Sequence, residues 1–452
     1  MRDTGPPLSA SLARRLDRIA ASDGEYWSFV NRDQREHVHS LLHYPAMMVP
    51  RLQRELLAAC LEWDPSIGLI MDPFVGSGTV LTEAMLAGRD FVGLDVNPLA
   101  ILACRVKAEN VSVAGLARAC KDVLCAVASD ASSATDLKLD HLGKWFEPHV
   151  RVGLSKLRRA ILAITNAGSR RFFWIVLAET IRLSSNSRTS TAKLHLRPPL
   201  EISTRPDPVT VFADVARRNL RSVALQADLL RERNLLTRGR YRGRCDLRIA
   251  DARTALVDGV GLVMSSPPYG DNHTTIAYGQ ASYLPLQWIP SEDISSHHSP
   301  ATAKPIRALD TASLGGSWKG ALVGVQGLLD RSPHLRRTWD LLADQPRDRR
   351  VRVAAYFRDL DASLDAVLAC VRPGALMLWT VADRSVGGTR MPLTLAIPEL
   401  LGGRAATVTS IQRTIPAVRK SMPTHNSVSE TIKTETVLVM RTPVAATRPT
   451  SS

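Results

Sequence analysis

The segment MDPFVGSGTVLTEAMLAG (71–88) constrains the fold most strongly, because it joins an apolar strand to a helix through a glycine-rich turn. The strand ends at Asp72, and Gly88 is a suitable residue to end the helix. Gly76 and Gly78 allow the backbone to approach a ligand closely, and the first N–H groups of the helix can bind a carboxylate. Such a turn is typical of the ligand-binding edge of an α/β sheet.

Short apolar segments bounded by turn residues recur along the chain, with helical periodicity between them. Near-continuous apolar runs are typical of strands covered on both faces, so the alternation predicts a doubly wound α/β fold. The expected strands are 67–71, 91–96, 246–250, 261–264, 375–381, 406–413 and 436–440, and the expected helices are 45–63, 78–86, 154–165, 172–183, 208–236 and 353–371.

The second and third expected strands are separated by about 150 residues, which is too many for one crossover helix. Residues 110–244 are therefore expected to form an inserted helical region between an N-terminal part, 1–109, and the remainder of the main domain, 245–442. A loop-rich insertion is expected at 271–346 and a disordered tail at 443–452.

The chain is strongly basic, with 58 Lys and Arg, 43 Asp and Glu, and a net charge of +15. The excess is concentrated in residues 151–245, which hold 20 basic and 6 acidic residues. This region suits a polyanionic partner, most simply nucleic acid, although a generally arginine-rich composition explains the charge as well. Arg188, Lys193 and Arg197 lie in a polar stretch (184–199) whose hydroxyl groups can also bind phosphates.

The composition argues against a secreted, membrane or zinc protein. Six cysteines show neither a CxxC pair nor metal-ligand spacing, which favours reduced thiols in a cytosol and predicts no metal site. The N-terminus lacks the apolar core of a signal peptide, and no apolar run is long enough to span a membrane. A cytoplasmic protein without a membrane partner is expected.

Two further segments carry polar groups at the ends of expected strands. Asp95 ends the strand FVGLDVNP (91–98), where a carboxylate can accept hydrogen bonds from both hydroxyls of a ribose. The turn at Gly76 lacks the GxGxxG of a pyrophosphate binder, so a ribose-bearing ligand without phosphates fits better. VMSSPPYG (263–270) places Ser266, two rigid prolines and a tyrosine after another strand, and by itself it is equally explained as a proline-stiffened loop.

Together, DPFVGSGT (72–79) resembles the cofactor motif and SPPY (266–269) the catalytic motif of the DNA amino-methyltransferase family. Weaker similarities to that family are HYPAMMVP (43–50), ADART (250–254), VRPGALMLWTVAD (371–383) and RTIPAVRKSMPTHN (413–426). The resemblance covers most of residues 35–442 except the basic insertion. It implies a seven-stranded Rossmann-like methyltransferase sheet with its motifs in one of the family's permuted orders.

The resemblance also implies S-adenosylmethionine as cofactor and double-stranded DNA as partner. The residues expected to bind the cofactor are Tyr44, Pro45, Asp72, Pro73, Phe74, Gly76, Ser77, Gly78, Thr79, Asp95, Asn97 and Asp251, the last beside the adenine. The catalytic residues would be Ser266, Pro267, Pro268 and Tyr269, and the DNA-binding candidates are Arg188, Lys193 and Arg197, with residues 271–280 as their rival. A restriction-modification or related system is expected, with a cognate restriction endonuclease as a candidate partner.

An exocyclic amino nitrogen is a poor nucleophile because its lone pair is delocalised into the ring. The resemblance implies that the Ser266 hydroxyl and the Pro267 carbonyl accept the amino hydrogens, while Tyr269 stacks on a base flipped out of the duplex. Direct methyl transfer then requires alignment and electrostatic complementarity but no covalent enzyme intermediate.

The alternatives differ in substrate or in class. Cytosine-C5 methylation needs a cysteine nucleophile, typically after a proline, and no cysteine here follows one. Ser266 favours cytosine N4 over adenine N6, whose enzymes usually carry Asp or Asn at that position. An RNA guanine-N2 methyltransferase usually has an acidic residue before the prolines. A catalytically silent DNA-binding subunit would not need both motifs, and the missing third glycine disfavours a nicotinamide oxidoreductase.

Overall fold

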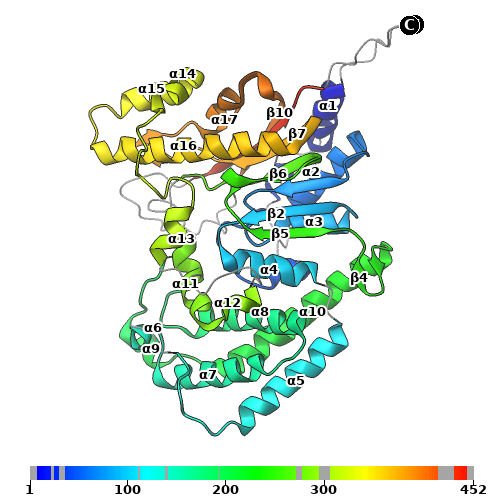
Figure 1. The fold of residues 1–452 in the computed structure, drawn as a ribbon, viewed down its shortest axis with the longest axis vertical. Coiled ribbons are helices and arrows are strands. Elements are labelled where there is room, and N and C mark those ends of the chain that lie inside the picture. The colour runs from blue at the N-terminus through cyan, green and yellow to red at the C-terminus, as the bar shows by residue number, and fades with distance from the viewer. Residues whose placement is uncertain are drawn as a thin grey trace.

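The computed structural model describes residues 8–21, 25–29, 36–109, 112–137, 141–191, 193–270, 277–294, 306–415 and 432–444. Its centre is a seven-stranded sheet with the order β10-β11-β7-β6-β1-β2-β5 (Figure 1). The strands β5, β2, β1, β6 and β7 are parallel, whereas β11 is antiparallel to both of its neighbours. The predicted doubly wound α/β fold with a seven-stranded Rossmann-like sheet is thereby confirmed.

All seven expected strands are present, with boundaries shifted by a few residues. They are β1 (Leu69–Asp72), β2 (Asp90–Asp95), β5 (Cys245–Ile249), β6 (Val260–Ser265), β7 (Val371–Val381), β10 (Ala406–Thr414) and β11 (Thr434–Arg441). Two small antiparallel hairpins were not expected: β3 (Leu236–Thr237) with β4 (Arg240–Tyr241), and β8 (Ser385–Val386) with β9 (Thr389–Arg390).

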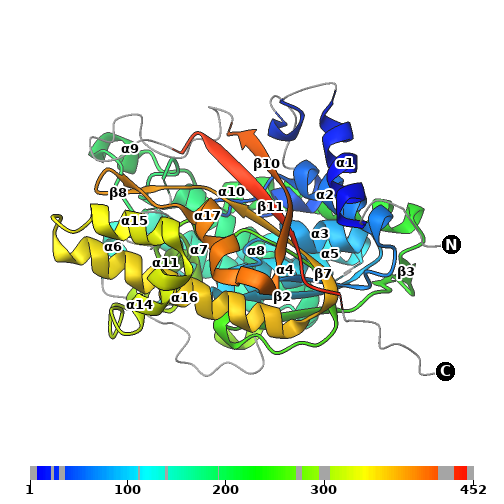
Figure 2. The same ribbon diagram turned by 90° about the horizontal axis from the view of Figure 1, so that it is seen from above.

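Helices cover both faces of the sheet, because successive strand residues point to opposite sides. On β1, Ile70 packs in the core beneath α1 (Leu8–Ala20), α2 (Pro50–Trp63) and α3 (Thr79–Leu86). Its neighbour Met71 packs in the opposite core, beneath α16 (Arg347–Cys370) and α17 (Leu393–Leu401). Figure 2 shows α1 beside α2 and β10, on the side of the sheet away from α16. Near-continuous apolar strands are the sequence signature of this double coverage.

The predicted helical insertion forms the lower end of the molecule in Figure 1, beyond α4 (Pro98–Ala108). Its helices are α5 (Val113–Ser129), α6 (Leu142–Trp145), α7 (Pro148–Leu162), α8 (Ala167–Ser184), α9 (Pro199–Ser203) and α10 (Pro208–Glu232). All of these helices except α9 share one hydrophobic core with α4, including the buried Phe172, Phe173 and Trp174. The insertion is therefore packed onto the sheet domain through α4.

Several expected helix boundaries are wrong for a local reason. The helix expected at 45–63 begins only at Pro50, since Ala46 has a left-handed φ of 52°. The helix expected at 208–236 ends at Glu232, just before Asn234 with φ 57° and the first hairpin. α16 begins at Arg347, earlier than expected, and α5 was not expected at all.

The segment 271–346 is not loop-rich where it is described. It contains α11 (Tyr278–Trp288), α12 (Ser291–Ile294), α13 (Ile306–Ala312), α14 (Val325–Arg331) and α15 (Pro333–Leu341). Most of the motif-like segment 413–426 and of the tail 443–452 lies outside the described residues. Within the described ranges, the model contains no helix with the length and apolarity of a membrane span.

Candidate active site

A cleft with about 860 Å³ of empty volume lies at the carboxyl ends of β1, β2 and β6. Ten of the twelve residues expected to bind a cofactor line it: Tyr44, Pro45, Pro73, Phe74, Gly76, Ser77, Thr79, Asp95, Asn97 and Asp251. Ser266 and Pro268 of the SPPY segment line the same cleft. Segments that are far apart in the sequence thus converge where an open parallel sheet usually binds its ligand.

Two glycines shape the turn between β1 and α3. Gly76 and Gly78 both have positive φ, 48° and 76°. A side chain at Gly76 would lie 3.4 Å from the Tyr44 ring at the cleft wall, and one at Gly78 would lie 2.8 Å from the Cys104 sulfur. Gly76 is therefore needed for a backbone that approaches the cleft, whereas Gly78 is needed for packing of α3 against α4.

Asp95 at the end of β2 is held in a fixed orientation. Its Oδ2 accepts a hydrogen bond of 2.9 Å from the Gly76 N–H, and its Oδ1 accepts one of 2.8 Å from the Asn97 N–H. Each oxygen retains a lone pair for a further donor. Burial raises the pKa of this carboxyl to about 6, since the charged form loses solvation.

The polar atoms of Asn97 are used within the protein. Its Oδ1 accepts from the Leu99 N–H as the N-cap of α4, and its Nδ2 donates to the Tyr44 hydroxyl at 3.1 Å and the Ser282 hydroxyl at 2.7 Å. The Tyr44 ring stacks on Tyr278, whose centroid is 6.0 Å away. Asn97 therefore shapes the cleft wall. Tyr278 and Ser282 of α11 were missed, because nothing in the sequence connects α11 with β2.

Asp72 and Asp251 have local partners. Asp72 does not line the cleft; it is fully buried, and its Oδ1 accepts from the Ser265 hydroxyl at 2.5 Å and the Phe74 N–H at 3.1 Å. This contact links the cofactor-motif strand to the strand that carries SPPY. Burial raises the Asp72 pKa to about 7. Asp251 faces the cleft and is paired with Arg253 at 2.5 Å.

The SPPY segment separates the cleft from a smaller cavity. Tyr269 lines this second cavity, of about 290 Å³ empty volume, together with Tyr356, Arg384 and Met391 among others. The Tyr356 hydroxyl donates to the Pro268 carbonyl at 2.6 Å. Pro267 is buried and lines neither cavity, and in the described part of the chain no donor is bonded to its carbonyl.

A chain of hydrogen bonds leads from Ser266 to the far edge of the sheet. The Ser266 hydroxyl donates to the Tyr269 hydroxyl at 3.3 Å, which donates to Glu435 Oε1 at 3.0 Å. Glu435 Oε2 pairs with Arg413 at 3.0 Å, and these two residues are directly opposite each other on β11 and β10. Neither residue is recognisable from the sequence as part of the site, since only strand pairing brings them to Tyr269.

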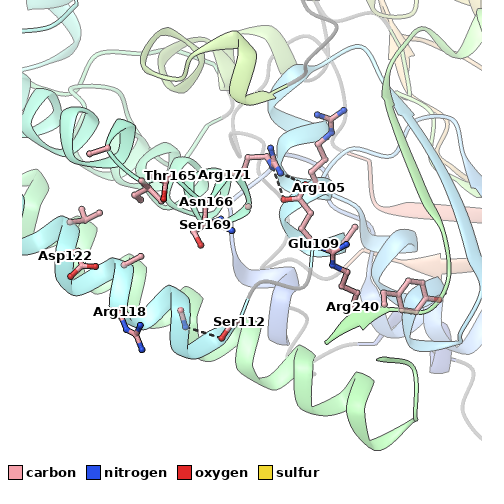
Figure 3. Close-up of a pocket in the computed structure, with 18 of the residues that line it drawn as sticks. Arg105, Glu109, Ser112, Arg118, Asp122, Thr165, Asn166, Ser169, Arg171 and Arg240 are labelled. Carbon is pink, nitrogen blue, oxygen red and sulfur yellow. Dashed lines mark hydrogen bonds and ion pairs between the residues drawn. The ribbon is translucent and has the colours of Figure 1, made fainter. Parts of the chain in front are cut away.

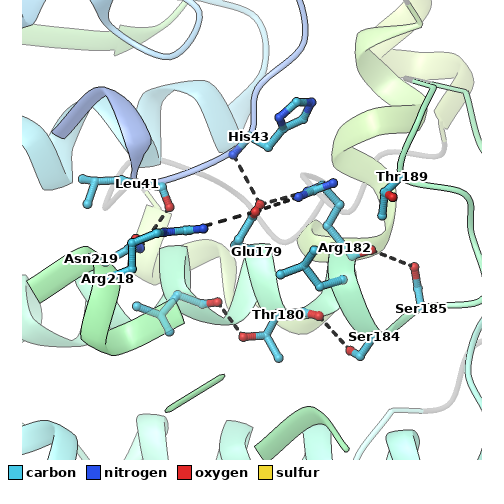
Figure 4. A network of polar contacts seen from close by, with 12 residues as sticks. Leu41, His43, Glu179, Thr180, Arg182, Ser184, Ser185, Thr189, Arg218 and Asn219 are labelled. Carbon is cyan, nitrogen blue, oxygen red and sulfur yellow. Dashed lines mark hydrogen bonds and ion pairs between the residues drawn. The ribbon is translucent and has the colours of Figure 1, made fainter. Parts of the chain in front are cut away.

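The helical insertion contacts the segment that leads into the cleft (Figure 4). Glu179 of α8 is buried, and its carboxylate accepts from the Arg182 guanidinium at 2.8 Å and from the His43 N–H at 3.3 Å. Asn219 of α10 donates to the Leu41 carbonyl at 2.9 Å. Two insertion helices thus hold residues 41–43, immediately before Tyr44.

The three DNA-binding candidates lie in different environments. The Arg197 guanidinium is used within its own loop, bonded to the Ser187 carbonyl at 3.0 Å and to Glu201 at 3.0 Å. Arg188 is exposed, and Lys193 is partly exposed. The Leu194 N–H donates to Gln280 of α11 at 3.1 Å, which places this loop beside the helix that carries Tyr278. Of the rival segment 271–280, residues 271–276 lie outside the described residues.

A large hollow lies away from these motifs (Figure 3). It has about 2610 Å³ of empty volume and is lined by the start of β5, the end of α4 and helices α5, α7 and α8. Arg171 and Glu109 on its wall are paired at 2.8 Å. The start of a parallel strand is the end opposite to the usual ligand edge, so this hollow is not the candidate active site.

One buried cluster consists of residue types that can bind a metal ion. Its members are His37, His39 and Glu83, and their potential ligand atoms lie within 4.8 Å of one another. Glu83 is already bonded to His39 at 3.0 Å and to Arg54 at 2.9 Å. The buried Lys107 adds another positive charge nearby. Two adjacent cations oppose a divalent ion, so these contacts favour an internal hydrogen-bonded network. No cysteine lines either the cleft or the Tyr269 cavity.

This strand order, with a glycine turn after β1 and an acidic residue at the end of β2, defines a Rossmann-like methyltransferase fold. The family model N6_N4_Mtase, DNA methylase, matches residues 15–103. Type II methyltransferase M.MvaI of Kocuria varians is 27% identical over 442 residues, covering 94% of each chain. These two similarities support the amino-methyltransferase (N6/N4) family of DNA methylases for this chain.

Two other similarities are more limited. Type II methyltransferase M.MjaII of Methanocaldococcus jannaschii is 30% identical over 94 residues, which cover 21% of this chain and 17% of that protein. The solved rRNA methyltransferase aviRa from Streptomyces viridochromogenes matches 88% of this chain and 89% of its own at 12% identity. Its TM-score of 0.29 is too low to support any conclusion about function.

Proposed function

We propose that this protein transfers a methyl group from S-adenosylmethionine to the exocyclic N4 amino group of cytosine in double-stranded DNA. The observation that carries the proposal is the position of SPPY between two cavities of different size. Ser266 and Pro268 line the 860 Å³ cleft, whereas Tyr269 lines the 290 Å³ cavity. A methyl donor in the first and a flipped base in the second would meet at Ser266.

The residues of the large cleft fit S-adenosylmethionine. The fixed Asp95 carboxylate has lone pairs for ribose hydroxyls, and the turn at Gly76, with its positive φ, brings the backbone to the cleft wall beside Tyr44. When bound, the cofactor would supply an electrophilic methyl group on a sulfonium.

The residues that line the smaller cavity have the chemistry to hold a base removed from the duplex. Tyr269 and Tyr356 provide aromatic surface, and the neighbouring Pro267 carbonyl and Ser266 hydroxyl provide two acceptors for one amino group. Two acceptors on the amino hydrogens make the nitrogen more tetrahedral and raise its nucleophilicity. A serine at this position favours cytosine N4 by family resemblance, and adenine N6 is the alternative.

The loop containing Arg188 and Lys193 is our proposed contact with DNA phosphates, because it lies beside α11 at the cleft. Arg197 is better explained as part of the loop's internal bonding. We expect the protein to act in the cytosol in a restriction-modification or related system, with a cognate endonuclease as a candidate partner.

Mass spectrometry of nucleosides tests this function directly. DNA from cells that express the gene should contain N4-methylcytosine, and DNA from cells that express Ser266→Ala should not. N6-methyladenine instead would correct the target base. If the DNA contains neither modified base although the purified protein binds S-adenosylmethionine, the proposed activity is wrong.

A further inference from the structure

The hydrogen-bond chain behind SPPY has a direction that the carboxylate imposes. An ionised carboxylate only accepts, so Tyr269 donates to Glu435, and its oxygen is left to accept from Ser266 (3.0 and 3.3 Å). The Ser266 proton therefore points away from the cleft. Both lone pairs of its oxygen remain for donors that come from the cleft.

Arg413 keeps this direction in place. Its side chain is 1% exposed, and it pairs with the Glu435 oxygen that Tyr269 does not use. Arg413 on β10 is the cation that contacts Glu435, and Arg352 and Arg384 line the small cavity beside Tyr269.

We propose that Glu435 acts through Tyr269 to make Ser266 an acceptor for the target amine and to take up the proton that methyl transfer releases. This inference rests on the proposed function. Glu435 is a positioning residue as well as a proton acceptor, because it does not touch the base itself.

Methyl transfer releases one proton from the amine nitrogen. The amine nitrogen forms a bond to the methyl carbon as the carbon–sulfur bond breaks and leaves its electron pair on sulfur. The nitrogen then carries one proton too many and gives it to the Ser266 oxygen. Ser266 passes its own proton to Tyr269, and Tyr269 passes its proton to Glu435, which becomes a neutral acid and later releases the proton to water.

The environment of Tyr269 suits a relay. Burial, with the adjacent Glu435 charge as a smaller contribution, raises its pKa well above the ordinary value. The hydroxyl thus stays protonated at neutral pH and can pass a proton on without becoming an anion. Glu435 retains 19% exposure of its side chain, which gives it access to water.

The test compares Glu435→Gln and Tyr269→Phe with the wild type in single turnover, at saturating cofactor and DNA. Each variant should slow methyl transfer by about 10²-fold, a typical effect of lost acid–base catalysis, while both binding affinities stay within about twofold. The wild-type rate should fall at acidic pH, and both variants should lack this decline. Glu399→Gln, which removes a remote ion pair with His334, is the matched control.

The double variant distinguishes a relay from two separate defects. If both residues serve one proton path, Tyr269→Phe with Glu435→Gln should be no slower than the slower single variant. The relay would be wrong if the single variants kept the fall in methyl-transfer rate at acidic pH. It would also be wrong if the rate losses of the two single variants multiplied in the double variant. If Glu435→Gln does not fold, Tyr269→Phe alone tests the same pH profile. A wild type that methylates no DNA amino group contradicts the proposed function instead.

Discussion

The cleft edge and the basic insertion use polar residues in opposite ways. At the cleft, few polar groups are present, and short backbone contacts orient them toward the ligand space, as with Asp95. In the insertion, basic residues are abundant, but many of them already pair with acidic residues of the protein. Arg159 pairs with Asp130 and Asp136, and Arg170 with Asp293.

This difference limits what a charge excess shows about binding. Residues 151–245 hold 20 basic and 6 acidic residues, yet acids from outside this range neutralise several of them. Others, such as Arg205 with the Leu183 carbonyl, hold the backbone between helices. Only basic side chains left unpaired near the cleft are good candidates for phosphate contacts.

The largest expected effect lies at the cleft. Ser266→Ala removes the acceptor for the target amine, so methyl transfer should fall by about 10²–10³-fold or more. Cofactor affinity should stay within about twofold, because the hydroxyl bonds to Tyr269 and not to the Asp95 region. Single-turnover assays and calorimetry measure the two quantities. An equal loss of both would mean that Ser266 shapes the cofactor site instead.

The second effect concerns cofactor affinity. Asp95→Ala should weaken S-adenosylmethionine binding by roughly 2–4 kcal/mol, since it removes two charged hydrogen bonds. The wild-type affinity should also fall as the pH drops through about 6, because protonation removes acceptor capacity. Calorimetry of Asp95→Asn across this pH range should show no such decline in affinity. The control is Asp72→Asn, which changes a fully buried carboxyl that does not line the cleft. Unchanged affinity in Asp95→Ala would place the cofactor elsewhere.

The third effect tests the contact between the two regions. Glu179→Ala removes the carboxylate that pairs with Arg182 and that accepts a hydrogen bond from the His43 N–H. We expect a loss of about 1.5–3 kcal/mol in unfolding free energy, the usual range for hydrogen bonds to a charged group. Cofactor affinity should fall as well, because the segment before Tyr44 loses its support. Denaturation experiments measure the first quantity and calorimetry the second. A loss of unfolding free energy with unchanged cofactor affinity would show that the insertion does not affect the cleft.

The smallest effect concerns DNA affinity. Arg188→Glu with Lys193→Glu should weaken binding to all duplex sequences and lower the salt slope by about two units, one for each phosphate contact. Arg217→Glu with Arg231→Glu makes the same charge change at exposed arginines that pair within α10. A larger loss in this second pair would place DNA on α10 instead. Electrophoretic or fluorescence titrations at several salt concentrations provide the measurement.

The sequence by itself determined the sheet and the two motifs at its edge. Apolar patterning located all seven strands. The pattern is most continuous in β1, β6 and β7, which are buried on both faces, whereas the edge strands β5 and β10 are partly exposed. The turn at Gly76 and the carboxylate at Asp95 were also predictable, since their contact depends on two neighbouring strand ends. The hydrogen bond between Asp72 and Ser265 was not predictable, because the two residues are 193 positions apart in the sequence.

Only the tertiary structure decided which polar groups act together. Strand pairing brings Glu435 and Arg413 to Tyr269, α11 brings Tyr278 and Ser282 to the cleft, and α8 places Glu179 against His43. None of these contacts follows from local pattern, because sequence-distant atoms meet only through packing. The same packing decides whether an arginine such as Arg197 bonds within its own loop or remains, like Arg188, exposed to bind a partner.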